Sequence, residues 1–270
     1  MTSLPPRVAV EWDATVYHRV SHPQFAWGER VLARLPLSGD ETVMDAGCGT
    51  GRLTAELLGR LPGGRVLAVD RSKNMLHIAS EHLMPHFAAR VQFILADLAA
   101  LPFSQSVDGI FSTAVFHWIT DHPRLFISLY GSLKPGGWVV AQCGGAGNLA
   151  RLYRRISVLM AAAPYAQHFA GWREPKEYAD DVTTAERMLT AGFVDVKTNS
   201  EPAPTVLGSA EAYAEFIASV ILHVHLTRLP TNSLREQFIN RLTDEARNDD
   251  PPFLLDYCRL NIEGKRPPLL

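Results

Sequence analysis

The sequence predicts an α/β fold in which helices cover both faces of a mostly parallel sheet. Short apolar segments alternate with amphipathic segments between residues 42 and 143, and strands that alternate with helices along a chain form parallel sheets. Glycines stand at positions 47, 49 and 51, directly after the first expected strand, and Asp70 ends the second one. Because ligands of such sheets bind at the carboxyl ends of the strands, we expect a nucleoside site there.

The expected elements follow one another through the first half of the chain. Residues 8–34 are predicted to form two helices split at Pro23, because proline lacks the amide hydrogen that a helix interior needs. Pro85 is expected to end the helix that begins at residue 73. The sheet region is predicted to contain strand 42–46, helix 51–60, strand 65–69, helix 73–83, strand 91–95, strand 107–113, helix 122–132 and strand 137–143.

The chain changes character at the glycine-rich segment 144–147. An aromatic and basic stretch at 165–182 has the composition of a lid rather than a core. The remaining elements are predicted from apolar periodicity and turn residues: helix 149–160, helix 184–191, strand 193–198, helices 209–226 and 232–247, and strand 253–262.

Composition limits the class of protein. The chain has 270 residues, of which 47% are hydrophobic, enough for one α/β domain with an accessory lobe. A net charge of −2 gives no basic surface for nucleic acid, and no apolar run approaches the roughly 20 residues of a membrane-spanning helix. The first residues lack the basic and apolar regions that are typical of a signal peptide, and the three cysteines include no Cys-x-x-Cys pair. We expect a cytoplasmic protein without a metal site, a nucleic-acid partner or membrane insertion.

The glycine loop discriminates between nucleoside cofactors. A dinucleotide loop needs the pattern Gly-x-Gly-x-x-Gly, but Arg52 stands where the third glycine would be. Asp45 lies at the mouth of the loop, where a carboxylate would repel a pyrophosphate. The same carboxylate would attract the ammonium and sulfonium groups of S-adenosylmethionine (SAM). Charge complementarity therefore favours SAM over NAD.

Four motifs resemble those of class I SAM-dependent methyltransferases, in the same order along the chain. They are Asp-Ala-Gly-Cys-Gly-Thr-Gly (45–51), Ala-Val-Asp (68–70), Ala-Asp-Leu (96–98) and Leu-Lys-Pro-Gly-Gly (133–137). The resemblance extends over about residues 10–145. It implies a Rossmann-like, mostly parallel seven-stranded sheet with a helical cap, SAM as the cofactor and S-adenosylhomocysteine as the product. It also implies that the alternating stretches near 193 and 253 pair antiparallel at one sheet edge.

This resemblance suggests four segments within a single domain. We expect an N-terminal helical cover (1–40), a SAM-binding core (41–145), a helical lid segment (146–192), and edge strands of the core with an inserted helical pair (193–270).

The same resemblance assigns candidate cofactor contacts. Asp70 would accept hydrogen bonds from the ribose hydroxyls, while Ser72 is better placed to cap the following helix. Asp97 and Leu98 would meet the adenine, and residues of the N-terminal cover would reach the methionine carboxylate, with Arg30 as a weaker alternative. The competing interpretation for several of these side chains is packing in the core. The full set of candidates is Tyr17, Gln24, Asp45, Ala46, Gly47, Gly49, Asp70, Arg71, Met75, Ala96, Asp97, Leu98, Thr113 and Phe116.

His117 is the candidate catalytic residue. It follows the fourth core strand and is the one titratable side chain expected at that strand tip. A histidine has a pKa suited to a general base, and a methyl acceptor needs a base only if it arrives protonated. Contact with the cofactor or acceptor, and simple packing, are the alternative roles for His117.

The acceptor is expected to be a small molecule. The Phe-His-Trp segment 116–118 and the late helices resemble the trans-aconitate methyltransferase group and its malonyl-carrier-protein relatives, which esterify carboxylates. Methylation of a lipid-like or polyketide-like acceptor and non-catalytic SAM binding remain alternatives, and the oligomeric state, monomer or homodimer, stays open. Thr113-Ala114-Val115-Phe116 does not match the step typical of enzymes that methylate base amino groups. Candidate acceptor contacts after residue 150 are Arg151, Arg154, Arg155, Tyr165, Arg173, His223, His225 and Arg228.

Overall fold

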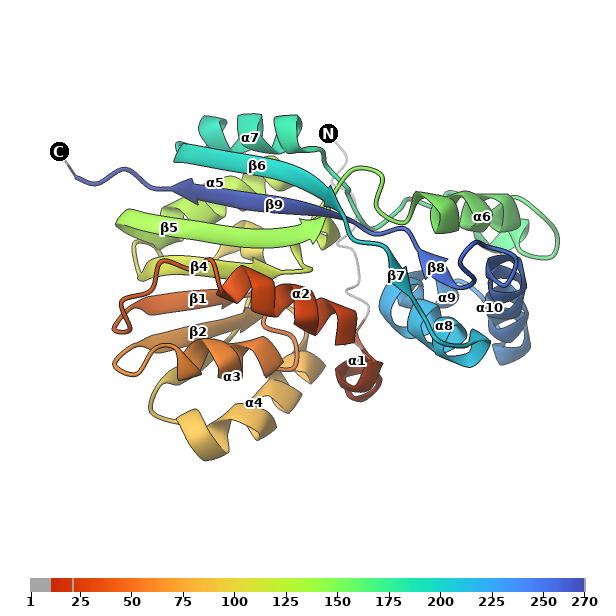
Figure 1. The fold of residues 1–270 in the computed structure, drawn as a ribbon, viewed down its shortest axis with the longest axis horizontal. Helices are drawn as coiled ribbons and strands as arrows, with labels where there is room; N and C mark the ends of the chain where they lie inside the picture. The colour runs from red at the N-terminus through yellow and green to blue at the C-terminus, as the bar shows by residue number, and fades with distance from the viewer. Residues whose placement is uncertain (1–10, 21, 270) are drawn as a thin grey trace.

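A seven-stranded sheet forms the centre of the molecule (Figure 1). The computed structural model describes residues 11–20 and 22–269. The strand order is β3-β2-β1-β4-β5-β9-β6; β1 to β5 run parallel, and β9 is antiparallel to both β5 and β6. The predicted mostly parallel α/β fold is thus confirmed. The strands are β1 (Thr42–Ala46), β2 (Arg65–Asp70), β3 (Val91–Leu95), β4 (Val107–Thr113), β5 (Leu133–Gly144), β6 (Val194–Pro202) and β9 (Cys258–Lys265).

Helices cover both faces of this sheet. On one face, α2 (His22–Leu32), α3 (Arg52–Gly59) and α4 (Lys73–Phe87) pack on Val43, Val66 and Phe111. On the other face, α5 (His122–Ser132) joins a buried cluster that includes Met44 and Val69, and α7 (Asp181–Thr190) packs beside α5 on β6 and β9. Because both faces are covered, most residues in the middle of β1, β2 and β4 are buried and apolar, as in parallel strands generally.

The start of α2 and the end of α4 differ from those predicted from the positions of Pro23 and Pro85. Two helices, α1 (Ala14–Val20) and α2, are present as predicted, but Pro23 lies in the first turn of α2 rather than between them, at a position where a missing amide hydrogen costs little. The prediction that Pro85 ends its helix is wrong, since α4 continues to Phe87. Phe87 packs against the same core cluster as Ala79 and Leu83, and this packing outweighs the unfavourable propensity of proline.

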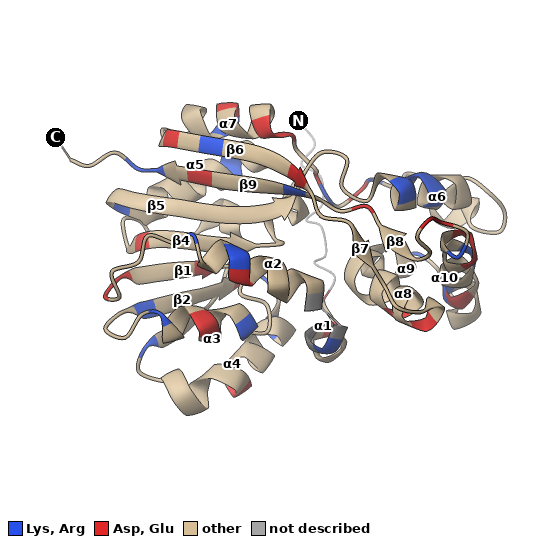
Figure 2. Cartoon of the chain, in the orientation of Figure 1, with Lys and Arg blue, Asp and Glu red and all other residues tan. Residues whose placement is uncertain are grey.

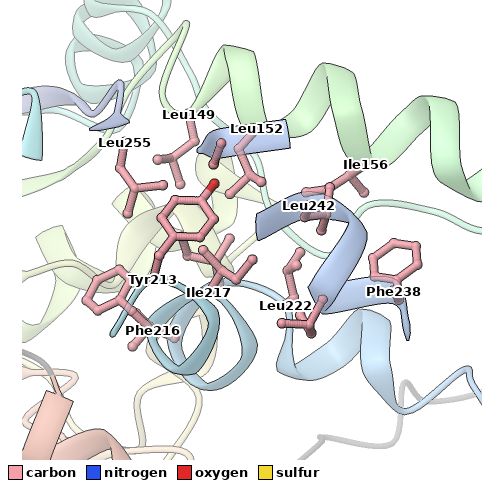
Figure 3. Close-up of a cluster of buried hydrophobic side chains, with 14 of the residues drawn as sticks. Leu149, Leu152, Ile156, Tyr213, Phe216, Ile217, Leu222, Phe238, Leu242 and Leu255 are labelled. Carbon is pink, nitrogen blue, oxygen red and sulfur yellow. The ribbon is translucent and has the colours of Figure 1, made fainter. Parts of the chain in front are cut away.

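A second group of helices lies beyond the carboxyl ends of the parallel strands and forms a cap (Figure 1). Its elements are α6 (Ala150–Met160), the short helix η3 (Ala166–His168), α8 (Ala210–Phe216), η4 (Ile217–Ile221), α9 (His223–Leu226), α10 (Asn232–Ala246) and the two-stranded sheet of β7 (Thr205–Val206) and β8 (Leu254–Leu255). Apolar side chains of α6, α8 and α10 meet in a separate buried cluster (Figure 3).

Two predicted elements of the cap are divided in the structure. The expected helix 209–226 contains a π-helical segment, η4, in which the Leu222 amide donates to the carbonyl of Ile217. The expected strand 253–262 is split into β8 and β9, because its first residues pair with β7 rather than with the main sheet. Apolar periodicity detects neither interruption, since both sides of each break remain buried.

Charged residues of both signs are distributed over the core and the cap (Figure 2). The arginines of α6 lie against acidic residues at the end of α10, with Arg151 and Arg155 both bonded to Asp249. In the part of the chain that the structure describes, no helix has the length and apolar character required to cross a membrane.

Candidate functional site

Three adjoining cavities open at the carboxyl ends of the parallel strands. Ala114, just after β4, lines all three. We call them the strand-end cavity, the loop cavity and the cap cavity. The strand-end cavity, of about 690 Å³, is lined by Trp12, Gly47, Gly49, Asp70, Arg71, Met75, Ala96, Asp97, Leu98, Thr113, Ala114, Val115, Trp118 and Ile119.

The glycine loop after β1 forms one wall of this cavity. The amides of Gly47 and Cys48 both donate to the carbonyl of Val69, at 2.8 and 3.0 Å, which fixes the loop against the end of β2. Gly47 has a φ of +84°, and a Cβ there would lie 2.2 Å from a methyl group of Val115. A Cβ on Gly49 would project into open space. The loop therefore leaves room for a ligand beside its backbone.

Asp70 occupies the bottom of the strand-end cavity. Its two carboxylate oxygens accept hydrogen bonds from the amides of Gly49 and Ser72, each at 2.9 Å. Burial raises the pKa of this carboxyl group, although these amides oppose the shift. Ser72, as predicted, caps α4 by accepting from the Met75 amide. Each Asp70 oxygen keeps acceptor capacity for a ligand hydroxyl.

Asp45 lies behind the glycine loop, in the loop cavity. This cavity also includes Gln24 of α2. Thr54 donates to the Asp45 carboxylate at 2.6 Å, yet burial raises the pKa of Asp45 to about 7. The Gln24 side-chain oxygen is buried without a hydrogen-bond partner. A buried carboxylate and an unsatisfied amide oxygen fit a ligand that brings an ammonium group.

The structure brings most of the predicted cofactor residues together. Asp97 is exposed at the rim of the strand-end cavity, and its carboxylate accepts from the Ala99 amide. The predicted residues that line the strand-end or loop cavity are Gln24, Asp45, Gly47, Gly49, Asp70, Arg71, Met75, Ala96, Asp97, Leu98 and Thr113.

Three predicted residues are placed differently. Ala46 is fully buried at the end of β1, where its carbonyl accepts from Ser112. The ring of Phe116 is turned into the core, edge-to-face with Phe126, while Trp118 at the end of the same short helix η2 (Phe116–Trp118) lines two cavities. The side chain of Tyr17 lies outside the described part of the chain.

His117 is buried in the wall of the cap cavity. Its Nδ1 accepts a hydrogen bond from the Gly144 amide at 3.2 Å, and its ring stacks on Tyr178. Burial, together with the charges of Arg259 and Lys176, lowers the pKa of His117 well below its usual value. A neutral imidazole that accepts at Nδ1 carries its proton at Nε2. His117 is therefore a hydrogen-bond donor at its second nitrogen.

The cap cavity lies between the sheet and the cap and has a volume of about 400 Å³. Two buried cations, Lys176 and Arg259, contribute to its wall. No aspartate or glutamate belongs to the set of described residues that line it. Those residues are Trp12, Gln24, Ala114, His117, Trp118, Asn148, Leu149, Lys176, Tyr178, Val220, Ile221, Tyr257 and Arg259. Trp12, Ala114 and Trp118 are shared with the strand-end cavity.

The sequence analysis named eight other residues, most of them basic, as candidate contacts of the acceptor. Tyr165 is in the apolar core of the cap, His225 pairs with Glu174 at 3.1 Å, and the Arg228 side chain donates to the carbonyl of His168. Arg151 and Arg155 are bound to Asp249, as described above, and Arg154 and Arg173 are exposed. His223 packs between Trp12 and Trp118. None of these eight residues lines the cap cavity.

The sequence analysis did not identify Lys176 and Arg259, which both line the cap cavity. Lys176 belongs to the aromatic and basic stretch that was expected to form a lid. Arg259 lies at a buried position of β9 and is followed by buried residues that include Leu260 and Ile262. A charged residue at the buried start of a strand is a signal that could have identified it, because buried charges require a partner or a function.

Comparisons with known proteins identify the family of the chain. A family described as "Methyltransferase domain" matches residues 44–141. A trans-aconitate 2-methyltransferase of Deinococcus radiodurans is 31% identical over 224 residues, covering 81% of this chain and 83% of the relative. One of Variovorax paradoxus is 28% identical over 271 residues, covering 95% and 99%.

Solved structures support the same fold. The YcgJ protein of Bacillus subtilis has a TM-score of 0.62 at 16% identity, covering 90% of this chain and 99% of its own. Phosphoethanolamine N-methyltransferase 2 of Haemonchus contortus, in complex with SAM, has a TM-score of 0.61 at 18% identity, covering 98% and 62%. The strand order, the glycine loop and these relatives together show that the chain belongs to the trans-aconitate methyltransferase family of class I SAM-dependent methyltransferases.

Proposed function

We propose that this methyltransferase transfers the methyl group of SAM to a carboxylate oxygen of a small acceptor bound in the cap cavity. The observation that carries the proposal is the lining of that cavity, which offers two buried cations and no carboxylate among the described residues. The trans-aconitate 2-methyltransferases to which the chain is similar are named for a carboxylic acid. We therefore take trans-aconitate as the first acceptor to test.

Residues of the strand-end and loop cavities would hold the cofactor. Asp70 would accept from the ribose hydroxyls, and Met75 and Leu98 would pack on the adenine side of the strand-end cavity. Asp45 and Gln24 would bind the ammonium end in the loop cavity. When bound, SAM supplies a methyl group bonded to a sulfonium, from which the neutral thioether leaves readily. The protein's remaining task is to align the acceptor and to exclude water.

The acid–base properties of the cap cavity favour an acceptor that is already ionised. His117 is neutral, and its Nδ1 is occupied by the Gly144 amide. Burial raises the pKa of Tyr178 to about 12, so its hydroxyl stays protonated at neutral pH. A hydroxyl or ammonium acceptor needs a general base, whereas a carboxylate is ionised at pH 7 without one.

Arg259 is the residue best placed to orient the carboxylate. Its guanidinium lies over the ring of Trp27, 4.5 Å from the ring centroid, and its Nε donates to the Gln142 side chain at 3.4 Å. Gln142 is itself fixed by Asn261, which accepts from its amide nitrogen at 2.9 Å. A guanidinium held in this way can bind a carboxylate through two parallel hydrogen bonds. Nε2–H of His117 would add a neutral donor in the same cavity.

The proposal is tested by turnover with matched acceptors. Purified protein is incubated with SAM and trans-aconitate, or with a small panel of carboxylic acids, each paired with its amide and alcohol. We expect methyl esters from the acids only, detected by mass spectrometry alongside S-adenosylhomocysteine. Arg259→Gln should reduce kcat/KM for the acid about ten- to hundredfold, because a hydrogen bond to a charged group contributes about 1.5–3 kcal/mol. Methylation of an amine or alcohol with no acid turned over would contradict the proposal.

We further propose that the enzyme works in the cytoplasm on small molecules rather than on nucleic acid. Charged residues of both signs are distributed along the described chain (Figure 2), and Cys48, Cys143 and Cys258 are all free thiols, which agrees with a reducing compartment. Fractionation of the source cells with an antibody to the protein would test the location.

A further inference from the structure

Lys176 is one of the two buried cations that line the cap cavity. Its side chain is 2% exposed. The ammonium donates to the Tyr153 hydroxyl of α6 at 2.7 Å and to the Ile221 carbonyl at 2.8 Å. Ile221 is the last residue of the π-helical segment η4. Lys176 therefore joins two separate elements of the cap through one charged group.

The same ammonium also lies on the face of Trp118. The distance from Nζ to the ring centroid of Trp118 is 4.4 Å. Trp118 lines both the strand-end cavity and the cap cavity, so its ring forms part of the wall between the proposed cofactor and acceptor sites. A cation over an indole face is a favourable and directional contact, strongest where water is excluded.

We propose that Lys176 is a positioning residue that fixes the Trp118 ring between cofactor and acceptor and connects it to the cap. The ammonium has three N–H groups, and two of them are bonded to Tyr153 and Ile221. These bonds hold Nζ in place over the indole. The proposal rests on the proposed acceptor site, because alignment across this wall matters only if the acceptor binds in the cap cavity.

Protonation controls this contact, because a neutral amine has no cation–π attraction. Burial lowers the pKa of Lys176 to about 8, and Glu174 opposes the shift. The ammonium is 3.6 Å from a Glu174 oxygen that has no hydrogen-bond partner. The titratable groups around Lys176 are Glu174 and Tyr178 on its own segment, Tyr153 on α6, His117 on η2, and His223 and His225 on α9.

These neighbouring groups do not titrate near pH 8, where Lys176 does. Burial lowers the pKa values of His117, His223 and His225, so all three histidines are neutral well before pH 8. Tyr153 has a pKa raised well above its usual value by burial. Within this cluster, a transition near pH 8 therefore reports Lys176.

The first test is spectroscopic and needs no acceptor. The indole N–H signal of Trp118, assigned with Trp118→Phe, is followed by ¹H–¹⁵N NMR between pH 7 and 9. We expect it to shift with a midpoint near pH 8 in the parent, and to be insensitive to pH in Lys176→Met. Trp138 on β5, distant from the cap cavity, serves as the internal reference. A Trp118 signal that does not change over this range would overturn the proposal.

The second test is kinetic. Lys176→Met should lower kcat/KM for the acceptor about ten- to thirtyfold, the equivalent of a desolvated cation–π contact, and the parent should lose activity as pH rises through 8. Lys197→Met, an exposed lysine of β6, should change neither. Lys176→Met also leaves the Tyr153 hydroxyl and the Ile221 carbonyl without this donor, so its melting temperature should fall, and kcat/KM is compared at a temperature where the variant is folded.

A failure of the Lys176 proposal can be distinguished from a failure of the proposed acceptor. A kcat/KM of folded Lys176→Met equal to that of the parent, together with a lower melting temperature, would show that Lys176 is merely structural. If no carboxylate is methylated by the parent, the proposed acceptor is wrong, while the NMR result still decides whether Lys176 positions Trp118.

Discussion

The backbone amide of Gly144 donates to Nδ1 of His117 at 3.2 Å. Gly144 is the last residue of β5, and a Cβ at this position would lie 2.7 Å from the Tyr178 ring that stacks on His117. This one contact determines the tautomer of the histidine. It assigns Nε2–H, rather than a basic nitrogen, to the cap cavity, and thus distinguishes the two chemical roles that the sequence left open for His117.

The pH profile of His117 variants tests this assignment. His117→Asn should reduce kcat/KM about tenfold, the lower end of the effect of one hydrogen bond to a charged acceptor. With SAM at saturation, so that the titration of Asp45 does not enter, the parent should show no activity transition near pH 6.5, since the pKa of His117 lies well below that value. A general base would produce the opposite result: a loss of about a hundredfold or more and an acid limb near pH 6.5.

Asp70→Ala should weaken the binding of S-adenosylhomocysteine at least tenfold, because two charge-assisted ribose contacts are removed. Isothermal titration measures this directly. Asp108→Ala is the matched control, because Asp108 bonds to Lys134 and to the Thr42 amide at the opposite end of the sheet. Equal affinity of the folded Asp70 variant and the parent would exclude the ribose role.

The affinity for S-adenosylhomocysteine should increase as pH rises through about 7. Burial raises the pKa of Asp45 to about 7, and only the ionised carboxylate attracts the ligand's ammonium group. Titrations in buffers of different ionisation enthalpy should also detect proton release on binding near pH 6. Binding that does not vary between pH 6 and 8 would show that Asp45 does not contact the ammonium.

The raised pKa of Asp45 also predicts that the stability of the cofactor-free protein changes with pH in the direction opposite to cofactor affinity. The folded-state pKa of Asp45 lies above its unfolded value, so its contribution to stability is complete below about pH 3.9 and is lost as pH rises through about 7. Asp45→Asn should therefore raise the melting temperature of the cofactor-free protein at pH 8 while weakening cofactor binding. A lower melting temperature would indicate that the ionised carboxylate is structurally required.

Substitutions of Ala114 test the role of the residue that lines all three cavities. It has a φ of +59°, and its amide donates to the Gln142 carbonyl at 2.8 Å. Ala114→Gly should preserve folding, because glycine adopts this conformation without strain. Ala114→Val should impair activity and stability together, since a β-branched residue is unfavourable at positive φ. If kcat/KM is similar in the two variants, this position does not limit alignment.

The core of the fold and the residues gathered around the strand-end cavity were predictable because their signals are local. The glycine loop, Asp70 and the 96–98 motif each follow or end a short strand that is rich in apolar residues. In a parallel sheet, these ends meet at one edge. Local motifs were therefore enough to predict that Gly49 and Asp70 lie together.

The cap side was not predictable, because its contacts join distant parts of the chain. Arg259 bonds to Gln142 and Lys176 to Ile221, and no spacing rule relates the members of these pairs. Phe116 illustrates a different limit: the turn of η2 determines which of two neighbouring aromatic rings faces the core. Pro85 shows that packing of a helix end can override a local stop signal.

The most direct test of the central claim is the chemical nature of the methylated product. SAM with a deuterated methyl group is incubated with the enzyme and trans-aconitate, and the product is treated with mild base. If a carboxylate oxygen is the acceptor, the label should be released quantitatively as deuterated methanol, because base hydrolyses methyl esters. Label that stays with the product after hydrolysis would show methylation at carbon, nitrogen or an ether oxygen, and would contradict the account.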